Sequence, residues 1–345
     1  MSSASLPPAE VRHSPAWGST KPSLSVIVST YRRAHYLPGL FDALEHQDLE
    51  RSRFEVVIAD DASTDDTWEV LRQFAESSPL SVCVARLAKN SGPSAGRNVA
   101  VELARAPLLA FTDDDCLPTP RWAAAMLAAL EDDAHRIVQG RTETEAGARG
   151  RWDHTLAIRA TTDLFETCNM GYHRADVRAV GGFRTLPGYR AGRGGSPMGG
   201  EDTLLGWDVL RATRQTTTAF ADDALVYHRI EPRDVRGWLH ERNGMDIFPG
   251  LIAGVPELRR RFFLRWFFSA RSAAFDLAFV GLLGAIVLRS WIPLLALLPY
   301  VTYLVPRRRR GLRLWARTVF VFIAGDAAAA WSLLRGSVRY RRLLI

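Results

Sequence analysis

Hydrophobic and polar positions along the first third of the chain follow an alternating strand and helix order. β-Branched apolar runs at residues 24–29 (LSVIVS) and 54–59 (FEVVIA) predict two buried parallel strands. Residues 37–47 and 67–77 have the periodicity of amphipathic helices, and the second is preceded by a polar cluster suited to capping. The pattern therefore begins as strand, helix, strand, helix.

The same order continues to residue 112. Residues 81–85 predict a third strand, small residues at 90–98 (NSGPSAGRN) lead into a helix through residue 103, and residues 108–112 (LLAFT) predict a fourth strand. Strands that alternate with helices favour an α/β fold with a doubly wound sheet. Its ligand crevice would lie beyond the carboxyl ends of the strands.

Beyond Trp122 the periodicity weakens. Glycine and arginine are frequent at residues 141–151 and 181–200, which we interpret as long loops over the pocket rather than as a second domain. Residues 221–228 (ADDALVYH) predict a late strand. We expect one α/β domain over residues 23–250, after a flexible segment at 1–22 that lacks the apolar core of a signal peptide.

The last quarter of the chain has three apolar stretches, at residues 272–288, 291–305 and 318–334. Each has 15 to 17 residues, which is short for a spanning helix of about 20. Buried core helices are the alternative, but arginines and the tryptophans Trp266, Trp291 and Trp315 near the ends fit a membrane interface better. We expect residues 251–345 to be a helical membrane-associated region, with a hairpin followed by an interfacial helix.

Charge refines this picture. The net charge of +7 comes largely from arginines near the C-terminus, including four in a row at residues 307–310. A basic surface suits either nucleic acid or anionic lipid, but beside apolar stretches we expect membrane lipid as the partner and no nucleic acid. The arginine run favours the cytoplasmic leaflet, which predicts a cell-membrane protein whose catalytic domain is cytoplasmic. Three cysteines without paired spacing indicate neither disulfides nor a zinc site.

Three successive carboxylates, Asp113, Asp114 and Asp115, end the fourth predicted strand. They repel one another unless a cation or hydrogen-bond donors compensate them. A hard divalent cation, Mn²⁺ or Mg²⁺, would bridge such carboxylates to a diphosphate and neutralise a leaving group. An exposed acidic turn is the alternative for an isolated triplet.

Polar residues also follow the other predicted strands. Asp60 and Asp61 would accept a hydrogen bond from a nucleotide base or form a turn and helix cap, and Tyr31 offers a face for stacking. In the loop at 90–98 small residues permit close approach to a ligand, with Arg97 as a phosphate contact. A P-loop lysine and a GxGxxG motif are absent from the sequence, which disfavours ATPases and dehydrogenases.

Together these segments resemble family 2 glycosyltransferases of the GT-A fold. The resemblance is carried by six motifs in family order between residues 24 and 228: VIVSTYRRAHYLPGLFDAL, EVVIADDASTDDT, NSGPSAGRNVA, LLAFTDDDCLPTPRW, CNMGYHRADVRAVGGF and GGEDTLLGWDVL. It implies a Rossmann-like doubly wound sheet and a nucleotide-sugar donor. Ala62 occupies the position where the family usually has glycine.

The resemblance also implies residue roles. Asp113 and Asp115 would form the DxD motif, Asp114 would lie near the donor ribose or sugar, and His228 resembles a histidine that reaches the metal or diphosphate. The residues assigned to the nucleotide-sugar are Ser29, Tyr31, Asp60, Asp61, Arg97, Asp113 and Asp114. The residues assigned to the metal are Asp113, Asp115 and His228.

On the acceptor side the resemblance implies Asp202 as the general base, with Glu201 as the alternative candidate for this role. Asn169 and Trp207 would line the acceptor, although Trp207 could equally be a core residue. A base opposite a metal-held diphosphate implies displacement with inversion. WLHERN at residues 238–243 stands in place of the QxxRW motif of processive members, which favours transfer of one sugar.

The expected acceptor is a hydroxyl or phosphate of a lipid-linked or envelope glycan. Two other classes of protein fit the sequence less well. An inactive GT-A domain serving as a membrane-bound binding module would not need the complete carboxylate set. A nucleotidyltransferase would need a glycine-rich loop after the first strand, which this sequence lacks.

Overall fold

The computed structural model describes residues 7–132, 134–186, 199–305 and 312–345, with the side chains of 312–317 excepted. The chain divides into two compact units. We call Met1–Arg149, His154–Thr185 and Glu201–Glu231 the N-terminal unit, and Gly150–Asp153, Leu186–Gly200 and Pro232–Ile345 the C-terminal unit. The first unit thus ends at Glu231, before the boundary at residue 250 that the sequence predicts. The arginine run at 307–310 lies outside the described residues.

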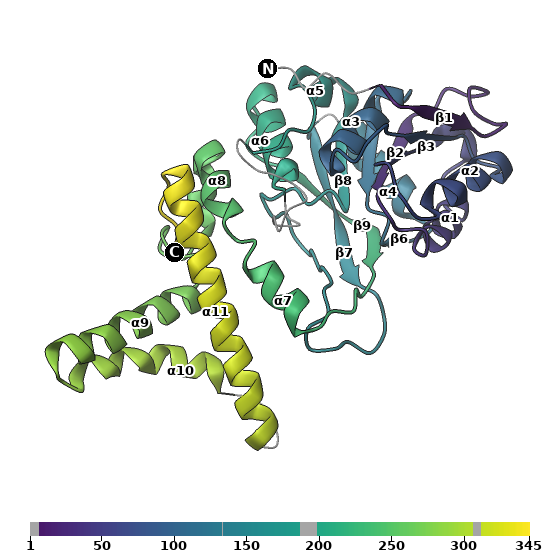
Figure 1. The fold of residues 1–345 in the computed structure, drawn as a ribbon. Coiled ribbons are helices and arrows are strands. Elements are labelled where there is room, and N and C mark those ends of the chain that lie inside the picture. The colour runs from purple at the N-terminus through teal and green to yellow at the C-terminus, as the bar shows by residue number, and fades with distance from the viewer. Residues whose placement is uncertain (1–6, 133, 187–198, 306–311) are drawn as a thin grey trace. The chain divides into compact units, whose positions relative to one another are not determined.

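The N-terminal unit is built on a mixed sheet (Figure 1). Four strands pair in parallel at its centre: β2 (Leu24–Thr30), β3 (Phe54–Asp60), β4 (Val82–Arg86) and β5 (Leu108–Thr112). Their apolar residues are buried because helices cover both faces of a parallel sheet. In this register Thr30 pairs with Asp60, so the polar residues that follow each strand emerge at one edge.

Five further strands extend this sheet on both sides. They are β1 (Glu10–His13), β6 (Cys116–Pro118), β7 (Ile137–Thr144), β8 (Asn169–His173) and β9 (Ala219–His228). The strand order is β1-β4-β3-β2-β5-β8-β7-β9-β6. Antiparallel β8 lies between β5 and β7, which brings Asn169 opposite Thr112. Antiparallel β6 pairs with β9, which brings His228 opposite Cys116.

The first three helices of this unit are those that the sequence predicts. The helices of the unit are α1 (Leu37–Glu45), α2 (Thr67–Ser77), α3 (Pro93–Leu103), α4 (Trp122–Glu131), α5 (Arg174–Ala179) and α6 (Glu201–Thr213), with a short 3₁₀ turn η1 (Arg51–Arg53). Prolines occupy the first turns of α1 and α3, where a missing N–H costs nothing. One core cluster packs α1, α2 and α4 against the sheet.

The α/β fold is confirmed, and the differences lie in the outer strands. Residues 10–13, expected to be flexible, form β1 and pair with β4. Residues 141–144, expected to be part of a loop, belong to β7. In both cases neighbouring strands supply hydrogen bonds that override a polar, strand-poor local sequence.

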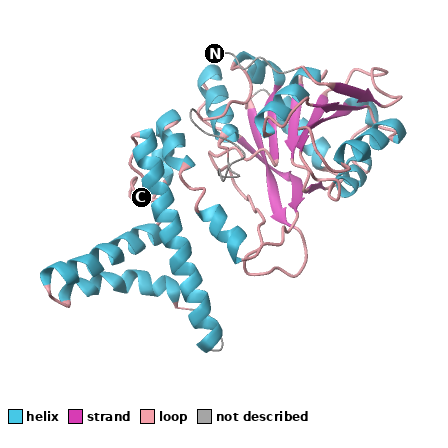
Figure 2. Cartoon of the chain, in the orientation of Figure 1, coloured by secondary structure: helices cyan, strands magenta, loops and turns pink. Residues whose placement is uncertain are grey.

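The C-terminal unit consists of helices (Figure 2). They are α7 (Val235–Arg242), α8 (Ile247–Gly254), η2 (Pro256–Arg261), α9 (Ala270–Leu288), η3 (Ile292–Leu297), α10 (Leu298–Leu304) and α11 (Leu312–Tyr340). Within this unit α9 and α10 run side by side and project sideways from α11 (Figure 1). The first two apolar stretches therefore form the predicted helical hairpin.

Close contacts fasten the hairpin. A capping box of Ser269 and Ser272 begins α9. A Cβ at Gly281 would lie 2.5 Å from the carbonyl oxygen of Pro293, so only glycine lets η3 approach this closely. At the base of the hairpin Asp326 of α11 accepts hydrogen bonds from Arg271 of α9, at 2.8 Å, and from Tyr300 of α10. One carboxylate thus joins all three helices.

Candidate active site

The loop after β3 contains the two carboxylates predicted to bind a base. Asp60 is fully buried, accepts a hydrogen bond from the backbone N–H of Ser63 at 3.1 Å, and lies 3.4 Å from Nε of Arg86. Burial raises the pKa of Asp60, against the opposing effect of these donors. Ala62 has a φ of +58°, a left-handed conformation that explains why glycine suits this position. Asp60 thereby stabilises a tight turn.

Asp61 fastens the loop before α3. Its two oxygens accept backbone hydrogen bonds from Ser91 and Gly92, both at 2.7 Å. Burial raises the pKa of Asp61 to about 6 in spite of these bonds. Tyr31, expected to stack on the base, is 40% exposed just beyond β2. Ser29 lies against Gly96, where an added Cβ would meet its Oγ.

The acidic triplet follows β5, as predicted. Asp114 is buried, and burial together with the charge of Asp115 raises its pKa to about 7. Burial and then Asp113 raise the pKa of Asp115, while His228 and Arg33 act in the opposite direction. The negative charges of these carboxylates are only partly balanced by neighbouring positive charges in the folded protein, which favours binding of a cation.

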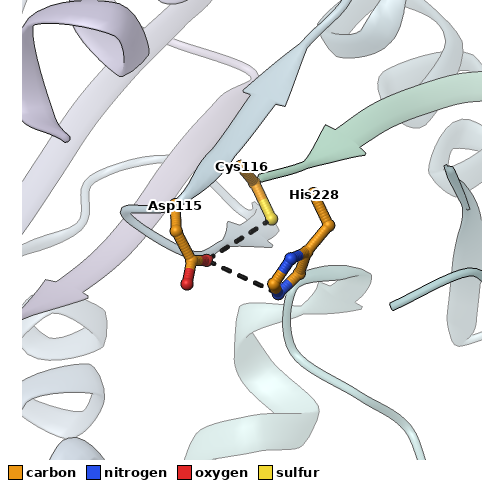
Figure 3. A group of neighbouring side chains, drawn as sticks. All are labelled: Asp115, Cys116 and His228. Atoms are coloured by element: carbon orange, nitrogen blue, oxygen red, sulfur yellow. Dashed lines mark hydrogen bonds and ion pairs between the residues drawn. The ribbon is translucent and has the colours of Figure 1, made fainter. Parts of the chain in front are cut away.

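His228 and Asp115 form a group that can ligate a metal (Figure 3). Nε2 of His228 lies 3.7 Å from Oδ1 of Asp115, and Sγ of Cys116 lies 3.9 Å from the same oxygen. Nδ1 of His228 lies 2.8 Å from the carbonyl oxygen of Arg229, which accepts a hydrogen bond if Nδ1 carries the proton. In that tautomer Nε2 presents its lone pair towards Asp115, the arrangement typical of metal-binding histidines.

Arg97 joins the acidic triplet to the start of α6. Its Nη2 lies 3.0 Å from Oδ1 of Asp113, and its Nη1 lies 3.2 Å from both Glu201 and Asp202. Burial opposes the charge on Arg97, but Asp202, Asp113 and Glu201 outweigh it and raise the arginine pKa. The side chain expected to contact the nucleotide is therefore buried among carboxylates, in the described structure.

Asp202 and Glu201 lie in the first turn of α6. Besides Arg97, Asp202 accepts a hydrogen bond from the backbone N–H of Thr167 at 3.1 Å. Burial raises the pKa of Asp202, Arg97 lowers it, and Glu201 and Asp113 raise it further, with a net upward shift. A carboxylate with a raised pKa is better matched to proton abstraction near neutral pH. Glu201 is also buried.

Asn169, which the resemblance assigns to the acceptor side, lies in β8 and is fully buried in the core. Its Oδ1 accepts a hydrogen bond from the indole N–H of Trp122 at 2.9 Å. Its Nδ2 donates to the carbonyl oxygens of Arg141 and Ala224, both at 2.8 Å. Both amide donors are thus used to connect β8 with β7 and β9, because a buried amide needs partners.

Trp207 is also buried, which agrees with the core alternative. Its ring packs edge-on against Phe165, and its indole N–H donates to the carbonyl oxygen of Asp163 at 3.0 Å. Asp163 and Phe165 both have positive φ angles, of 57° and 58°. Trp207 therefore stabilises the bent loop that carries Thr167 to Asp202.

Three residues at this centre were not predicted: Arg33, Glu231 and Cys116. Arg33 lies 3.9 Å from Asp114, 4.0 Å from Asp115 and 3.3 Å from Glu231. Arg33 and Glu231 are 198 positions apart, so the fold alone reveals their pairing. For Cys116 the position next to the acidic triplet was the available signal.

Sequence comparison identifies the domain. The family described as Glycosyl transferase family 2 matches residues 25–186. Glycosyltransferase AglE from Haloferax volcanii is 30% identical over 126 residues, 36% of this chain and 41% of that protein. Validoxylamine A glucosyltransferase from Streptomyces hygroscopicus is 36% identical over 115 residues, 33% of this chain and 27% of that protein. The chain matches less than half of the length of these curated relatives.

Solved structures agree on the fold. The mannosyltransferase PcManGT from Pyrobaculum calidifontis, in complex with GDP-Man and Mn²⁺, aligns with a TM-score of 0.62 at 19% identity, over 94% of this chain and 91% of that chain. TarS from S. aureus in complex with UDP-GlcNAc aligns with a TM-score of 0.51 at 20% identity, over 93% and 92%. Residues 25–186 therefore match family 2 of the glycosyltransferases, and the structure has the GT-A fold.

Proposed function

We propose that this chain is an inverting, metal-dependent transferase that moves a single sugar from a nucleotide-sugar to an acceptor hydroxyl or phosphate. The observation that carries the proposal is the position of Arg97, which contacts Asp113 with one nitrogen and Glu201 and Asp202 with the other. A donor-side carboxylate and the candidate base are thereby held on two sides of one guanidinium. That arrangement suits a reaction in which acceptor and leaving group lie on opposite faces of a sugar.

The donor set fits a divalent cation. Asp115 and His228 offer a carboxylate oxygen and an imidazole nitrogen within one group of potential ligands, and Asp113 lies in the same triplet. Oxygen and nitrogen ligands suit Mn²⁺, while oxygen alone suits Mg²⁺. When bound, the cation would neutralise charge on the departing diphosphate. PcManGT, which has the same fold, is described with GDP-Man and Mn²⁺.

Asp202 acts as the general base in this proposal. Its carboxylate takes the proton of the acceptor hydroxyl while the acceptor oxygen forms a bond to the anomeric carbon. The bond from that carbon to the diphosphate oxygen breaks, and its electron pair leaves with the nucleoside diphosphate. The backbone N–H of Thr167 and the guanidinium of Arg97 orient the base. One displacement without a covalent intermediate inverts the anomeric carbon.

The remaining roles follow from position. The exposed Tyr31 lies beyond β2 as a stacking surface for the base, close in sequence to Ser29. Asp60, Asp61 and Asp114 would shape the nucleotide pocket, the first two mainly through the loops that they fasten. UDP-GlcNAc in the TarS complex and GDP-Man in the PcManGT complex support a nucleotide-sugar donor, without selecting its base or sugar.

Membrane attachment through the C-terminal unit is part of the proposal. Among the described residues, Ala270–Leu288 and Thr318–Tyr340 are long and apolar enough to span a bilayer, and only 17% and 28% of the apolar window in each is buried. The hairpin geometry favours insertion of α9 and α10, with α11 along the interface. A membrane-held enzyme suits a lipid-linked or envelope glycan acceptor at the cytoplasmic face of the cell membrane.

Donor binding tests this proposal. Isothermal titration of the full chain in detergent would use UDP-, GDP- and dTDP-sugars, each with Mn²⁺ and with EDTA. We expect one nucleotide class to bind only with the metal, and we expect Asp115→Asn to abolish this metal-dependent binding. The matched control is Asp65→Asn, in the loop before α2 and outside the candidate metal group. Metal-independent binding, or binding unchanged in Asp115→Asn, would contradict the metal assignment, and no binding would favour a degenerate domain.

A further inference from the structure

Arg33 lies among three carboxylates at the candidate metal centre. Its Nη1 lies 3.3 Å from Oε1 of Glu231, its Nε 3.9 Å from Oδ1 of Asp114, and its Nη2 4.0 Å from Oδ2 of Asp115. The side chain is only 29% exposed, which limits screening by water. A permanent positive charge thus lies next to the residues that would hold a divalent cation.

The position of this arginine is fixed from several directions. The backbone N–H of Arg33 donates to Oγ1 of Thr67 at 3.0 Å, and its guanidinium lies over the ring of Tyr36. The preceding Arg32 has a φ of +56°, and its N–H donates to Oγ of Ser63 at 2.8 Å. Hydrogen bonds to the loop after β3 and to the start of α2 therefore fix the backbone conformation of the loop after β2. These contacts limit how far the guanidinium of Arg33 can move away from Asp115 when another cation binds there.

Asp115 is shared between this arginine and the metal group. Its Oδ1 faces Nε2 of His228 at 3.7 Å, and its Oδ2 faces Arg33. A divalent cation at Asp115 and His228 would therefore bind beside a fixed positive charge, which repels it. A diphosphate carries enough negative charge to contact both cations, and a guanidinium matches phosphate oxygens in geometry.

We propose that Arg33 contacts the diphosphate of the donor and makes the binding of divalent metal and nucleoside diphosphate mutually dependent. Either ligand alone binds weakly, because Arg33 repels the metal and the carboxylates repel the diphosphate. Together they bind tightly, since each supplies the charge that the other requires. Glu231 and Tyr36 hold the guanidinium ready for the phosphate. This inference rests on the proposed function, since it takes a nucleotide-sugar as the donor.

The test measures Mn²⁺ affinity from the electron paramagnetic resonance signal of free Mn²⁺, with and without UDP, GDP or dTDP. For the wild-type chain we expect the matching nucleotide to tighten Mn²⁺ binding by about 10-fold or more, and Mn²⁺ to tighten nucleotide binding by the same factor. In Arg33→Gln, Mn²⁺ alone should bind several-fold more tightly than in wild type. The coupling factor should fall towards one.

Two further variants separate charge from structure. Arg33→Lys keeps the repulsion of Mn²⁺ but loses the two-nitrogen fork, so Mn²⁺ alone should bind as weakly as in wild type while coupling is reduced. The matched control is Arg32→Gln, because the neighbouring Arg32 is exposed and should change neither affinity. Thermal unfolding of each variant shows whether it is folded.

Each outcome decides a different claim. Weaker binding of Mn²⁺ alone in Arg33→Gln, with unchanged coupling, would mean that Arg33 only orders the carboxylates, and would overturn the inference. Tight but uncoupled binding in wild type would overturn it as well. If wild type bound neither Mn²⁺ nor any of the three nucleotides, the proposed function itself would fail.

Discussion

The two units of this protein handle polarity in opposite ways. The N-terminal unit buries charged side chains, among them Asp60, Asp114 and Arg97. The C-terminal unit leaves large apolar side chains exposed, such as Val287 at 78% and Trp291 at 69%. Both arrangements cost free energy in water. Buried charges lose their hydration, and exposed apolar surface orders the neighbouring water molecules. Each arrangement therefore suits a component that binds to or surrounds that unit.

The component that would do so differs between the units. In the N-terminal unit the raised pKa values of Asp114 and Asp115 indicate carboxylates that are short of positive charge, as a metal and nucleotide pocket would be. In the C-terminal unit the exposed residues belong to α9, η3 and α10, which is compatible with the proposed lipid environment. The following predictions test this contrast, from the largest expected effect to the smallest.

The largest effect should follow from removing the proposed base in the N-terminal unit. Asp202→Asn should lower turnover by about 10²-fold or more while donor affinity is nearly preserved, because only the proton transfer is lost. Release of nucleoside diphosphate measures turnover, and titration calorimetry measures affinity. If Glu201→Gln shows this pattern and Asp202→Asn does not, Glu201 is the base.

The second effect concerns Asn169, a buried polar residue whose side chain connects three strands. Asn169→Ala would leave the indole N–H of Trp122 and the carbonyl oxygens of Arg141 and Ala224 without their partner. We expect the free energy of unfolding to fall by about 2 to 4 kcal/mol. Chemical denaturation measures this loss. Normal stability of Asn169→Ala together with weakened acceptor binding would instead support a role for Asn169 in binding the acceptor.

The third effect is a dependence of stability on pH. A carboxyl whose folded pKa is raised, as for Asp114 at about 7, binds protons more tightly in the folded state. The metal-free protein should therefore lose stability as pH rises from 5.5 to 8, by about 2 kcal/mol for this residue. Thermal unfolding of wild type and Asp114→Asn at pH 5.5 and 8 measures it. A variant less stable than wild type at pH 8 would contradict this view.

The smallest effect concerns the hairpin. In Gly281→Leu the new side chain would clash with Pro293 and Ala296, so the fraction of protein that floats with anionic vesicles at high salt should fall several-fold. The matched control is Val280→Leu, because Val280 is 63% exposed on the same helix. Flotation that is unaffected by Gly281→Leu, yet lost at high salt in wild type, would indicate a purely electrostatic attachment.

The sequence predicts the central fold well because its signals are local. The β-branched runs of β2, β3 and β5 and the periodic helices between them lie in continuous segments. β7 and β8 could not be predicted in this way, since residues such as Gly140 and Asn169 become strand residues through pairing with distant segments. The alanine-rich α4 had a helical signal that the sequence analysis did not use.

The candidate site is only partly visible in the sequence. The carboxylates of the DxD segment and the residues Asp202 and His228 can be selected because motifs mark them. The fastening roles of Asp60 and Asp61 depend on backbone N–H groups of other loops, which a sequence pattern does not reveal. Arg33 was missed for a similar reason, since its partners Asp114 and Glu231 are brought to it by the fold.

The anomeric configuration of the released sugar tests the central claim most directly. In the absence of acceptor, slow transfer to water gives a free sugar that proton NMR can observe before its anomers interconvert. With Mn²⁺ and the matching donor, the account predicts a sugar whose configuration is opposite to that of the donor, and no release with EDTA or in Asp202→Asn. Release with retained configuration, or release that persists in EDTA, would contradict the account.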